Sequence, residues 1–459
     1  MYLKLYDDTM PDLRKEFGAL LSRVEKALSD HGCDVVRADV CRIAGEFHKA
    51  ADAFKSADVD CVVTLHLAYS PSMESAQALA GLDVPIVILD TTMDARFGRD
   101  VDPERIMVNH GIHGVMDLAS VLSRMQRRFH IVAGHVDDAT VMERVAGVVG
   151  AAYAARCFRS TRALRIGESF RGMGDFSVDG AVLENVLGIR VDQIAPADLA
   201  RDVESVSTRD VQEELTRDRK RFVCNVPEEV HTRSVRVGLG VRRRLEAGGY
   251  NAFSMNFAEF DGSTEAVDTI PFLEASKAMS RGIGYAGEGD ILTAALVGAL
   301  QRGLGLTTFT EIFCPDWQGD SLFLSHMGEI NPDVAAEKPV VLEKPFPWTA
   351  AENPAVLTCA PCEGEAVFVN LAPGPDDSFS LVVAPVTVLG DSTVEEMKVS
   401  VRGWIRPRCP VPDFLEAYSR HGGTHHSGLV LGDRLEAVEA FADFIGVPCC
   451  TIRQGGGQR

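Results

Sequence analysis

The chain has 459 residues, more than one hydrophobic core normally holds, and we expect roughly two to four domains. Its composition is that of a globular protein, with 46% hydrophobic and 24% charged residues and a formal net charge of −20. This charge argues against nucleic acid as a partner, because a binder has to neutralise phosphates with clustered Lys and Arg. It suits a protein that handles small, neutral or metal-bound ligands.

The sequence predicts neither a membrane span nor secretion. The most apolar window, 145–155, holds eleven residues between two arginines, whereas a spanning helix needs about 20. The first residues lack the basic and then apolar pattern of a signal peptide. Eleven scattered cysteines, an odd number, indicate reduced thiols rather than a disulfide framework. We therefore expect a cytoplasmic, soluble protein that binds neither membranes nor nucleic acid.

The first domain is predicted to span residues 1–162 and to alternate helices with strands. Apolar residues recur at helical spacing from Leu13 to Leu28, and Gly32 follows as a helix stop. Short apolar runs that predict buried strands lie at 59–65, 85–89 and 130–133. Because strands alternate with helices, we predict a doubly wound parallel sheet covered on both faces.

A second α/β domain is predicted at residues 163–305. It opens with a buried strand at 163–167 that ends in a glycine. Helices are predicted at 211–221, 237–247, 271–279 and 290–300. The mixture again indicates a doubly wound parallel sheet.

The third domain, residues 306–459, has a β-rich pattern. Strands are predicted at 307–313, 340–342, 366–371, 379–386 and 395–404. Their alternation and the Pro and Gly turns between them favour a small antiparallel barrel or sandwich. Predicted helices at 413–420 and 433–444 flank a pair of histidines, and the tail from residue 454 is expected to be disordered.

Five residues of this chain offer carboxylate and imidazole groups that could meet at one metal ion. Glu288 lies between two glycines, where a backbone can approach a ligand closely, although a surface turn explains the run equally well. Glu311 lies in a β-like run among apolar residues, so it is either on a solvent face or buried for a reason. His326 could be a core histidine, and His425-His426 could lie in a glycine-lined loop. Together they suit a divalent ion with carboxylates that move protons.

Two other motifs have structural explanations. Gly238-Leu-Gly240 lacks the third glycine of a dinucleotide-binding fingerprint, because Arg243 occupies its place. Cys359-Ala-Pro-Cys362 has the spacing of a redox or zinc pair, but no second pair follows it. We expect helix packing for the first motif and a structural or incidental role for the second.

Taken in order, these segments resemble the L-arabinose isomerase family, and more distantly L-fucose isomerase, over most of the chain. The most specific match is Gly284-Tyr-Ala-Gly-Glu-Gly-Asp290. Further segments in family order lie at 65–71, 109–114, 130–135, 165–173, 248–253 and 425–427.

The resemblance implies a metal-dependent aldose–ketose isomerase that acts on an open-chain pentose, deoxyhexose or modified sugar. Glu288, Glu311, His326 and His426 would bind a divalent ion, most often Mn²⁺, with Mg²⁺ or Co²⁺ as other options and His425 as the alternative ligand. The two glutamates would also transfer the proton through an enediol. A metal-assisted hydride shift between C1 and C2 is the competing mechanism.

The resemblance also implies sugar contacts from His110, His113 and Met173. Family members form hexamers with active sites between subunits, so we expect a homo-oligomer, hexameric or trimer-based, in which His113 acts in trans. His110 stands where a glutamine is usual, and Tyr6-Asp-Asp8 replaces another segment on the sugar side. These departures leave the sugar open. The alternatives are an isomerase of the L-fucose or D-arabinose type and a non-catalytic sugar-binding homologue.

Overall fold

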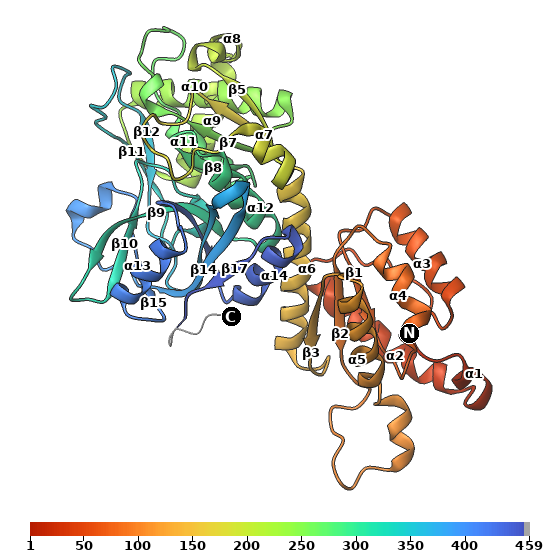
Figure 1. Ribbon diagram of the computed structural model, residues 1–459. Helices are drawn as coiled ribbons and strands as arrows, with labels where there is room; N and C mark the ends of the chain where they lie inside the picture. Colours follow the sequence, from red (N-terminus) through yellow and green to blue (C-terminus); the bar gives the residue numbers. More distant parts are fainter. Residues whose placement is uncertain (454–459) are drawn as a thin grey trace. The chain divides into compact units, whose positions relative to one another are not determined.

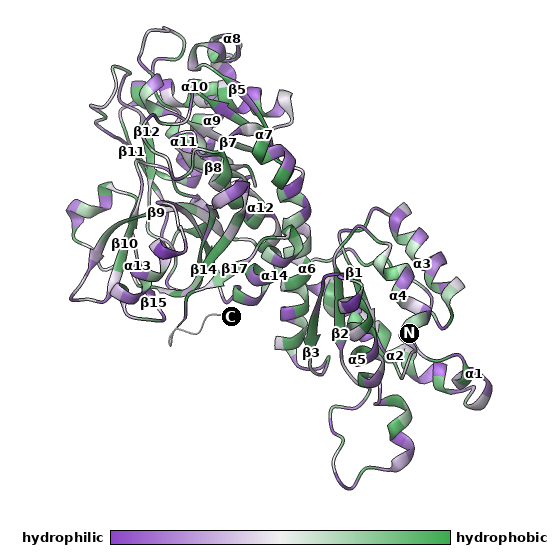
Figure 2. Cartoon of the chain, in the orientation of Figure 1, coloured by the Kyte–Doolittle hydropathy of each residue, from purple (hydrophilic) through white to green (hydrophobic). Residues whose placement is uncertain are grey.

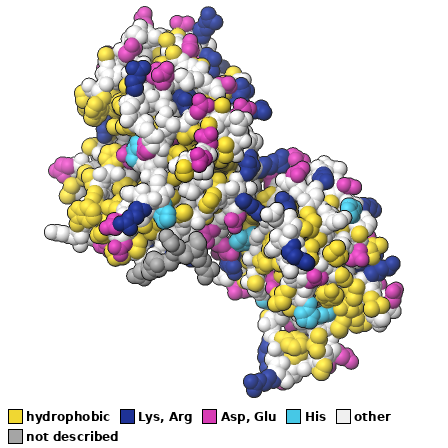
Figure 3. All heavy atoms as spheres, viewed as in Figure 1, with side chains coloured by type: hydrophobic (Ala, Val, Ile, Leu, Met, Phe, Trp, Pro, Cys, Tyr) yellow, Lys and Arg dark blue, Asp and Glu magenta, His cyan; other side chains and the backbone are white. Residues whose placement is uncertain are grey.

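The computed structural model describes residues 1–453, which fold as two compact units, Met1–Tyr153 and a second that begins at Ala154 (Figure 1). The expectation of a disordered tail from residue 454 lies outside the described residues. None of the helices within residues 1–453 combines the length and the apolar character that a membrane crossing requires. On the face shown in Figure 3, acidic and basic side chains are interspersed.

The first unit is built on a parallel sheet. Its strands, in the order in which they pair, are β1 (Val62–Leu65), β2 (Ile86–Asp90) and β3 (Phe129–Ala133). Its helices are α1 (Leu5–Thr9), α2 (Leu13–Asp30), α3 (Ala44–Ser56), α4 (Ser72–Ala80), the 3₁₀ helix η1 (Pro103–Val108), α5 (Ile112–Arg124) and the beginning of α6 (Ala139–Arg159). The strands are apolar and the helices carry both apolar and polar faces (Figure 2). This is the pattern of a parallel sheet covered by helices.

Helix α2 shows how the predicted periodicity produces this layer. The apolar residues of the predicted stripe are buried: Leu13, Phe17, Leu20, Val24 and Leu28. Their spacing of three and four residues places them on one face of the helix, and the polar residues between them remain accessible.

The second unit begins with another parallel sheet, in the order β5-β4-β7-β8. Its strands are β4 (Arg162–Ile166), β5 (Arg190–Ile194), β7 (Ala252–Met255) and β8 (Gly284–Gly287). The helices of this part are α7 (Gly180–Val182), the π turn η2 (Leu183–Leu187), η3 (Pro196–Leu199), α8 (Ala200–Glu204), α9 (Thr208–Arg221), α10 (Glu228–Gly248), η4 (Phe257–Glu259), α11 (Phe272–Ser280) and α12 (Ile291–Leu304). A small sheet of β6 (Val223–Asn225), β11 (Val340–Glu343) and β12 (Ala355–Thr358) adjoins them.

Strand β8 and helix α12 are in direct backbone contact. A Cβ atom added at Gly284 would lie 1.9 Å from the carbonyl oxygen of Ala294 and 2.8 Å from the Cα of Gly298. Only glycine permits this approach. The turn between β8 and α12 is therefore held in one place, and this turn carries Glu288.

In the described chain, six antiparallel strands close into a barrel, because the first and last strands of the order β13-β16-β9-β10-β15-β14 also pair with each other. These strands are β9 (Thr307–Asp316), β10 (Ser321–Ser325), β13 (Gly364–Pro373), β14 (Phe379–Val388), β15 (Gly403–Pro407) and β16 (His426–Leu431). The remaining elements are β17 (Cys449–Thr451), which pairs with β14 in parallel, the 3₁₀ turns η5 (Pro332–Val334), η6 (Pro375–Asp377) and η7 (Glu395–Val399), and helices α13 (Val411–Arg420) and α14 (Leu435–Ile445).

The predicted fold class, two parallel α/β layers followed by a β-rich barrel, is confirmed. One element within it was predicted wrongly. The segment 395–404 was expected to be a strand, but Glu395–Val399 forms a 3₁₀ turn and the strand begins only at Gly403. Glu395 and Lys398 form an ion pair at a spacing of three residues, which a helical turn permits and a strand does not.

Candidate metal centre

The predicted ligands converge because of the register of the barrel. Strand β9 lies between β10 and β16, and Glu311 is paired with His426 on one side and with Ser325 on the other. His326 directly follows Ser325, so three predicted ligands lie at neighbouring positions of the ladder. Glu288 joins them from the turn after β8.

The side chains form two overlapping groups. Glu288, His425 and His426 offer ligand atoms within 4.8 Å of one another, and Glu311, His326 and His426 do the same. The Nε2 atom of His426 lies 3.6 Å from a Glu288 carboxylate oxygen, and the Nε2 atom of His326 lies 4.0 Å from Glu311. His426 belongs to both groups, and its Nε2 is buried without a hydrogen-bond partner.

Carboxylates fix the orientation of two of these imidazoles. The Nδ1 atom of His326 lies 2.8 Å from Glu329 Oε2, and the Nδ1 atom of His426 lies 3.1 Å from Asp290 Oδ2. Asp290 is also the N-cap of α12, because its side chain accepts a hydrogen bond from the Thr293 amide. With Nδ1 paired in this way, each ring turns its Nε2 toward the glutamates, as metal-binding histidines do.

His425 differs from the other two histidines because both of its ring nitrogens have partners. Its Nδ1 lies 2.6 Å from Asp175 Oδ2, and its Nε2 lies 3.4 Å from Glu288 Oε2. The backbone amide of His425 donates to the same Asp175 oxygen at 3.0 Å.

Aromatic rings pack the histidines in place. Phe309 meets the rings of His326 and His426 edge-on, with centroids at 4.7 and 5.0 Å. Phe176 stacks on His426 from another side, with centroids 5.1 Å apart. Such packing restricts the rings and keeps water away from part of the cluster.

The pKa values of the two glutamates are shifted in opposite directions. Burial raises the pKa of Glu311, because it disfavours the charged carboxylate. Burial acts in the same direction on Glu288, but the hydrogen bond from His425 and the neighbouring histidines outweigh it and lower the pKa of Glu288.

Two histidines are shifted toward the charged form. Burial alone would lower the pKa of His326, but Glu329 outweighs it and raises that pKa. For His425, burial is outweighed by hydrogen bonds to Glu288 and Asp175, which raise its pKa to about 9. The cluster therefore combines carboxylates and imidazoles whose protons are strongly coupled.

The backbone at Glu288 is unusual, and the glycines on either side of it allow close contacts with neighbouring segments. Glu288 has φ 62°, in the left-handed region, which costs a non-glycine residue of the order of 1 kcal/mol. A Cβ at Gly287 would lie 2.7 Å from the His326 ring, and one at Gly289 would lie 2.7 Å from the Glu168 carbonyl oxygen. The Gly-Glu-Gly run thus lets the turn approach both neighbours.

The other predicted site residues are not among the groups of described residues that could hold a metal ion. His110 and His113 belong to the first unit, where His110 Nε2 lies 3.0 Å from the Tyr6 hydroxyl and the two histidine rings meet edge-on at 5.9 Å. Met173 lies in the loop after β4 and is partly buried. Met173 shares this loop with Asp175 and Phe176, which contact the two adjacent histidines.

Three residues of the cluster were not predicted. Glu329 binds His326 and also accepts a hydrogen bond from Tyr285 at 2.7 Å, and its spacing of three residues from His326 could have indicated it. Asp175 and Phe176 lie in a glycine-containing loop, and nothing in that sequence points to the histidines.

Neither of the two remaining motifs is part of the groups within residues 1–453 that could hold a metal ion. Gly240 lies within α10 and packs against Val203, which confirms the expected helix packing. Cys359 is buried and Cys362 is exposed, and all cysteines of the described residues are free.

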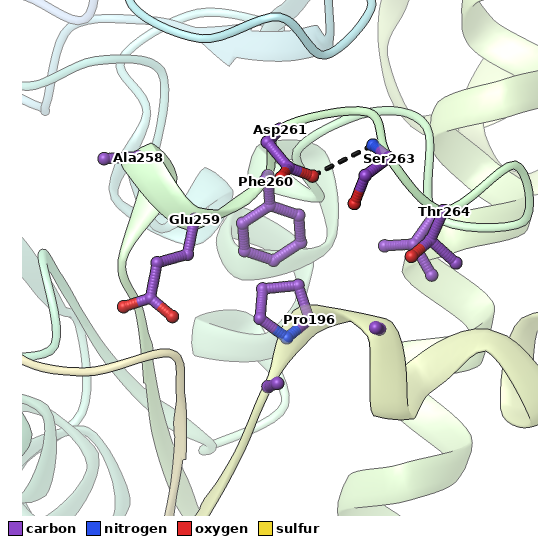
Figure 4. A pocket seen from close by; sticks show the side chains of 10 residues that line it. Pro196, Ala258, Glu259, Phe260, Asp261, Ser263 and Thr264 are labelled. Carbon is purple, nitrogen blue, oxygen red and sulfur yellow. Dashed lines mark hydrogen bonds between the residues drawn. The ribbon is translucent and has the colours of Figure 1, made fainter.

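A cavity of about 380 Å³ lies apart from the cluster, beyond the carboxyl ends of β5 and β7 (Figure 4). The rings of Pro196 and Phe260 face each other in it, and the Asp261 carboxylate accepts a hydrogen bond from the Ser263 amide. None of the predicted site residues lines it.

Comparison with known proteins identifies the family. Models of the N-terminal, central and C-terminal domains of L-arabinose isomerase match residues 6–160, 162–303 and 306–448. An L-arabinose isomerase of Shouchella clausii is 27% identical over 89% of this chain and 86% of its own length. Those of Escherichia coli K12 and Anoxybacillus flavithermus are each 28% identical, over 83% and 86% of this chain and 78% and 80% of their own lengths. The chain therefore belongs to the L-arabinose isomerase family, and with it to the aldose–ketose isomerases, which are intramolecular oxidoreductases.

Proposed function

We propose that this protein is a divalent-metal-dependent isomerase that converts an open-chain aldose, a pentose, deoxyhexose or modified sugar, into its ketose. The proton is transferred by glutamates through an enediol. The observation that carries this proposal is the convergence of Glu288, Glu311, His326 and His426 around the unpartnered Nε2 of His426.

The residues present fit a divalent ion. Two carboxylates and two imidazoles form a mixed oxygen and nitrogen set that suits Mn²⁺, with Mg²⁺ and Co²⁺ as alternatives. When bound, the ion would polarise the sugar carbonyl and acidify the C2 proton. Glu329 and Asp290 hold the rings of His326 and His426 for this purpose.

We assign the fourth ligand to His426 rather than His425. The Nε2 atom of His426 is buried, has no partner and faces both glutamates, whereas both nitrogens of His425 are engaged. A buried nitrogen without a partner costs free energy unless a ligand satisfies it.

The glutamates are the acid–base pair. Glu288 and Glu311 each offer a carboxylate oxygen within 4.8 Å of a ring nitrogen of His426, so that one carboxylate can take the C2 proton and the other can return a proton to C1, while the hydroxyl proton on O2 passes to O1. Glu288 is buried and Glu311 is partly buried, which limits the access of water to the transfer.

His110, His113 and Met173 complete the proposed site as sugar contacts. In line with the family resemblance, we propose that His113 acts from a neighbouring subunit of a hexamer or other trimer-based homo-oligomer. A monomer in analytical ultracentrifugation would contradict this arrangement.

The free cysteines of the described residues support a cytoplasmic location. The change from parallel sheets to a barrel supports domains at 1–162, 163–305 and 306–459.

The proposal is tested by screening aldoses for ketose formation. Protein stripped with a chelator is assayed alone and after addition of Mn²⁺, Mg²⁺ or Co²⁺, against pentoses, deoxyhexoses and their modified forms. We expect no conversion without metal and restored conversion with Mn²⁺. Binding of sugars without conversion of any of them would leave only a sugar-binding homologue, and full activity after stripping would exclude the metal.

A further inference from the structure

The segment 168–179, called the strap here, connects β4 to α7 and passes over the metal cluster. Most of its residues are exposed, and it contains Gly172, with φ 97°, and Gly174, neither of which has a close neighbour. A loop of this composition would normally be free to move. Phe176 is an exception, because only 2% of its surface is exposed.

The strap contacts residues of the cluster at three points; away from the cluster, the Glu168 amide donates to the Glu259 carboxylate at 2.7 Å and the Phe170 ring packs on Phe257. The Phe170 amide donates to the Glu288 carbonyl oxygen at 2.9 Å. Asp175 accepts from the backbone amide and from Nδ1 of His425. Phe176 stacks on His426 with an angle of 15° between the rings.

Asp175 makes the most specific of these attachments. A single carboxylate oxygen, Oδ2, holds both the backbone and the ring of His425, at 3.0 and 2.6 Å. A ring fixed at Nδ1 and at its own backbone cannot rotate, so its Nε2 edge remains turned toward Glu288, 3.4 Å away. The chain of contacts therefore runs from Asp175 through His425 to the carboxylate of Glu288.

We propose that Asp175 is a positioning residue for the isomerisation: it fastens the strap over the cluster and orients His425 against Glu288. This inference rests on the proposed function, because the contact between His425 and Glu288 serves catalysis only if Glu288 transfers the proton. Asp175 itself has a side chain that is 38% exposed and lies on the far side of His425 from that carboxylate, so it acts only through His425.

The first test is a double-mutant cycle on kcat and KM with the full-length, Mn²⁺-loaded protein. We expect D175A to lower kcat about 10- to 100-fold, as the loss of outer partners in metal sites typically does, although His425 itself is not a proposed ligand. In an H425A background the same change should cost less than about 2-fold, because the route through His425 is already lost. D175N should recover most of the activity, since its carboxamide oxygen still accepts a hydrogen bond from His425.

The second test measures the strap without turnover. Trypsin can cut after the exposed Arg171, and mass spectrometry identifies the fragment that begins at Gly172. We expect D175A to be cut there at least about 5-fold faster than wild type. D179N is the matched control, because Asp179 lies in the same strap, only caps α7 by accepting from the Ala181 amide, and is replaced by an equally good cap.

The outcomes separate this inference from the proposed function. Unchanged kcat in D175A, or losses that add fully to those of H425A, would overturn the positioning role. Equal cleavage of D175A, D179N and wild type would overturn the fastening. If wild type converts no aldose, the proposed function fails, and the cleavage rates alone then decide whether Asp175 fastens the strap.

Discussion

Replacing Glu288 with Gln is expected to lower ketose formation by at least about 10³-fold while leaving the fold intact, and E311Q should have a similar effect. Each change keeps the size of the side chain and removes the proton-transfer group. General acid–base groups contribute about 10²–10⁴-fold, and the loss of a proposed metal ligand adds to that. Initial rates with saturating Mn²⁺ measure the effect, and circular dichroism checks the fold.

E365Q is the matched control for E311Q. Glu365 also lies on a barrel strand, but it is exposed and pairs with Arg408 on the surface. Its activity should equal that of wild type, because exposed ion pairs contribute little. If E288Q or E311Q retained a tenth of the wild-type kcat under saturating metal, the role of that glutamate in proton transfer would be wrong.

Replacing Lys277 with Met is expected to be the most destabilising change outside the metal cluster. Lys277 on α11 binds Asp218 at 2.7 Å and also binds Glu214, and all three side chains are at most 6% exposed. Removing the ammonium leaves buried carboxylates short of a partner, which costs about 3–5 kcal/mol. In a unit of this size the melting temperature should fall by roughly 5–10 °C in differential scanning calorimetry.

The exposed pair of Lys398 and Glu395 provides the control, and K398M should change the melting temperature by less than about 1 °C.

The pH dependence of the melting temperature gives a second check. Burial would raise the pKa of Glu214, but Arg242 and Lys277 outweigh it and hold that pKa well below its ordinary 4.5. The stabilisation that the Glu214 ion pairs give the fold is therefore fully present above pH 4.5, and it is lost as the pH falls toward the lowered pKa of Glu214. The difference in melting temperature between K277M and wild type should become smaller below about pH 4. A difference in melting temperature that stays constant with pH would contradict this account.

Elements with strong apolar patterns could be predicted from the sequence. The apolar stripe of α2 and the apolar runs of the parallel strands are local features of the sequence. Each pattern follows directly from which side chains of a helix or strand are buried. Strand β5 was missed because it lies at the edge of its sheet and its residues, Arg190–Ile194, alternate weakly between exposed and partly buried. Strand β16 was missed because its first residues follow two glycines and a threonine, which suggest a loop.

The candidate site was predicted as a set of residues but not as an arrangement. Glu311 and His426 are more than a hundred positions apart in the sequence, and only the pairing of β9 with β16 places them side by side. The choice between His425 and His426 depends on which ring nitrogen has a partner, and that depends on Asp175 in a distant loop. Such contacts follow from tertiary packing, which local spacing does not encode.

The central claim is that Glu288, Glu311, His326 and His426 together hold one divalent ion. The most direct measurement is anomalous diffraction from crystals of the chelator-stripped protein soaked in Mn²⁺. The account predicts a single strong peak per chain, in contact with both carboxylates and with the Nε2 atoms of His326 and His426, while His425 keeps its contact with Asp175. A peak bound by His425 in place of His426, or no peak at this cluster at saturating Mn²⁺, would contradict it.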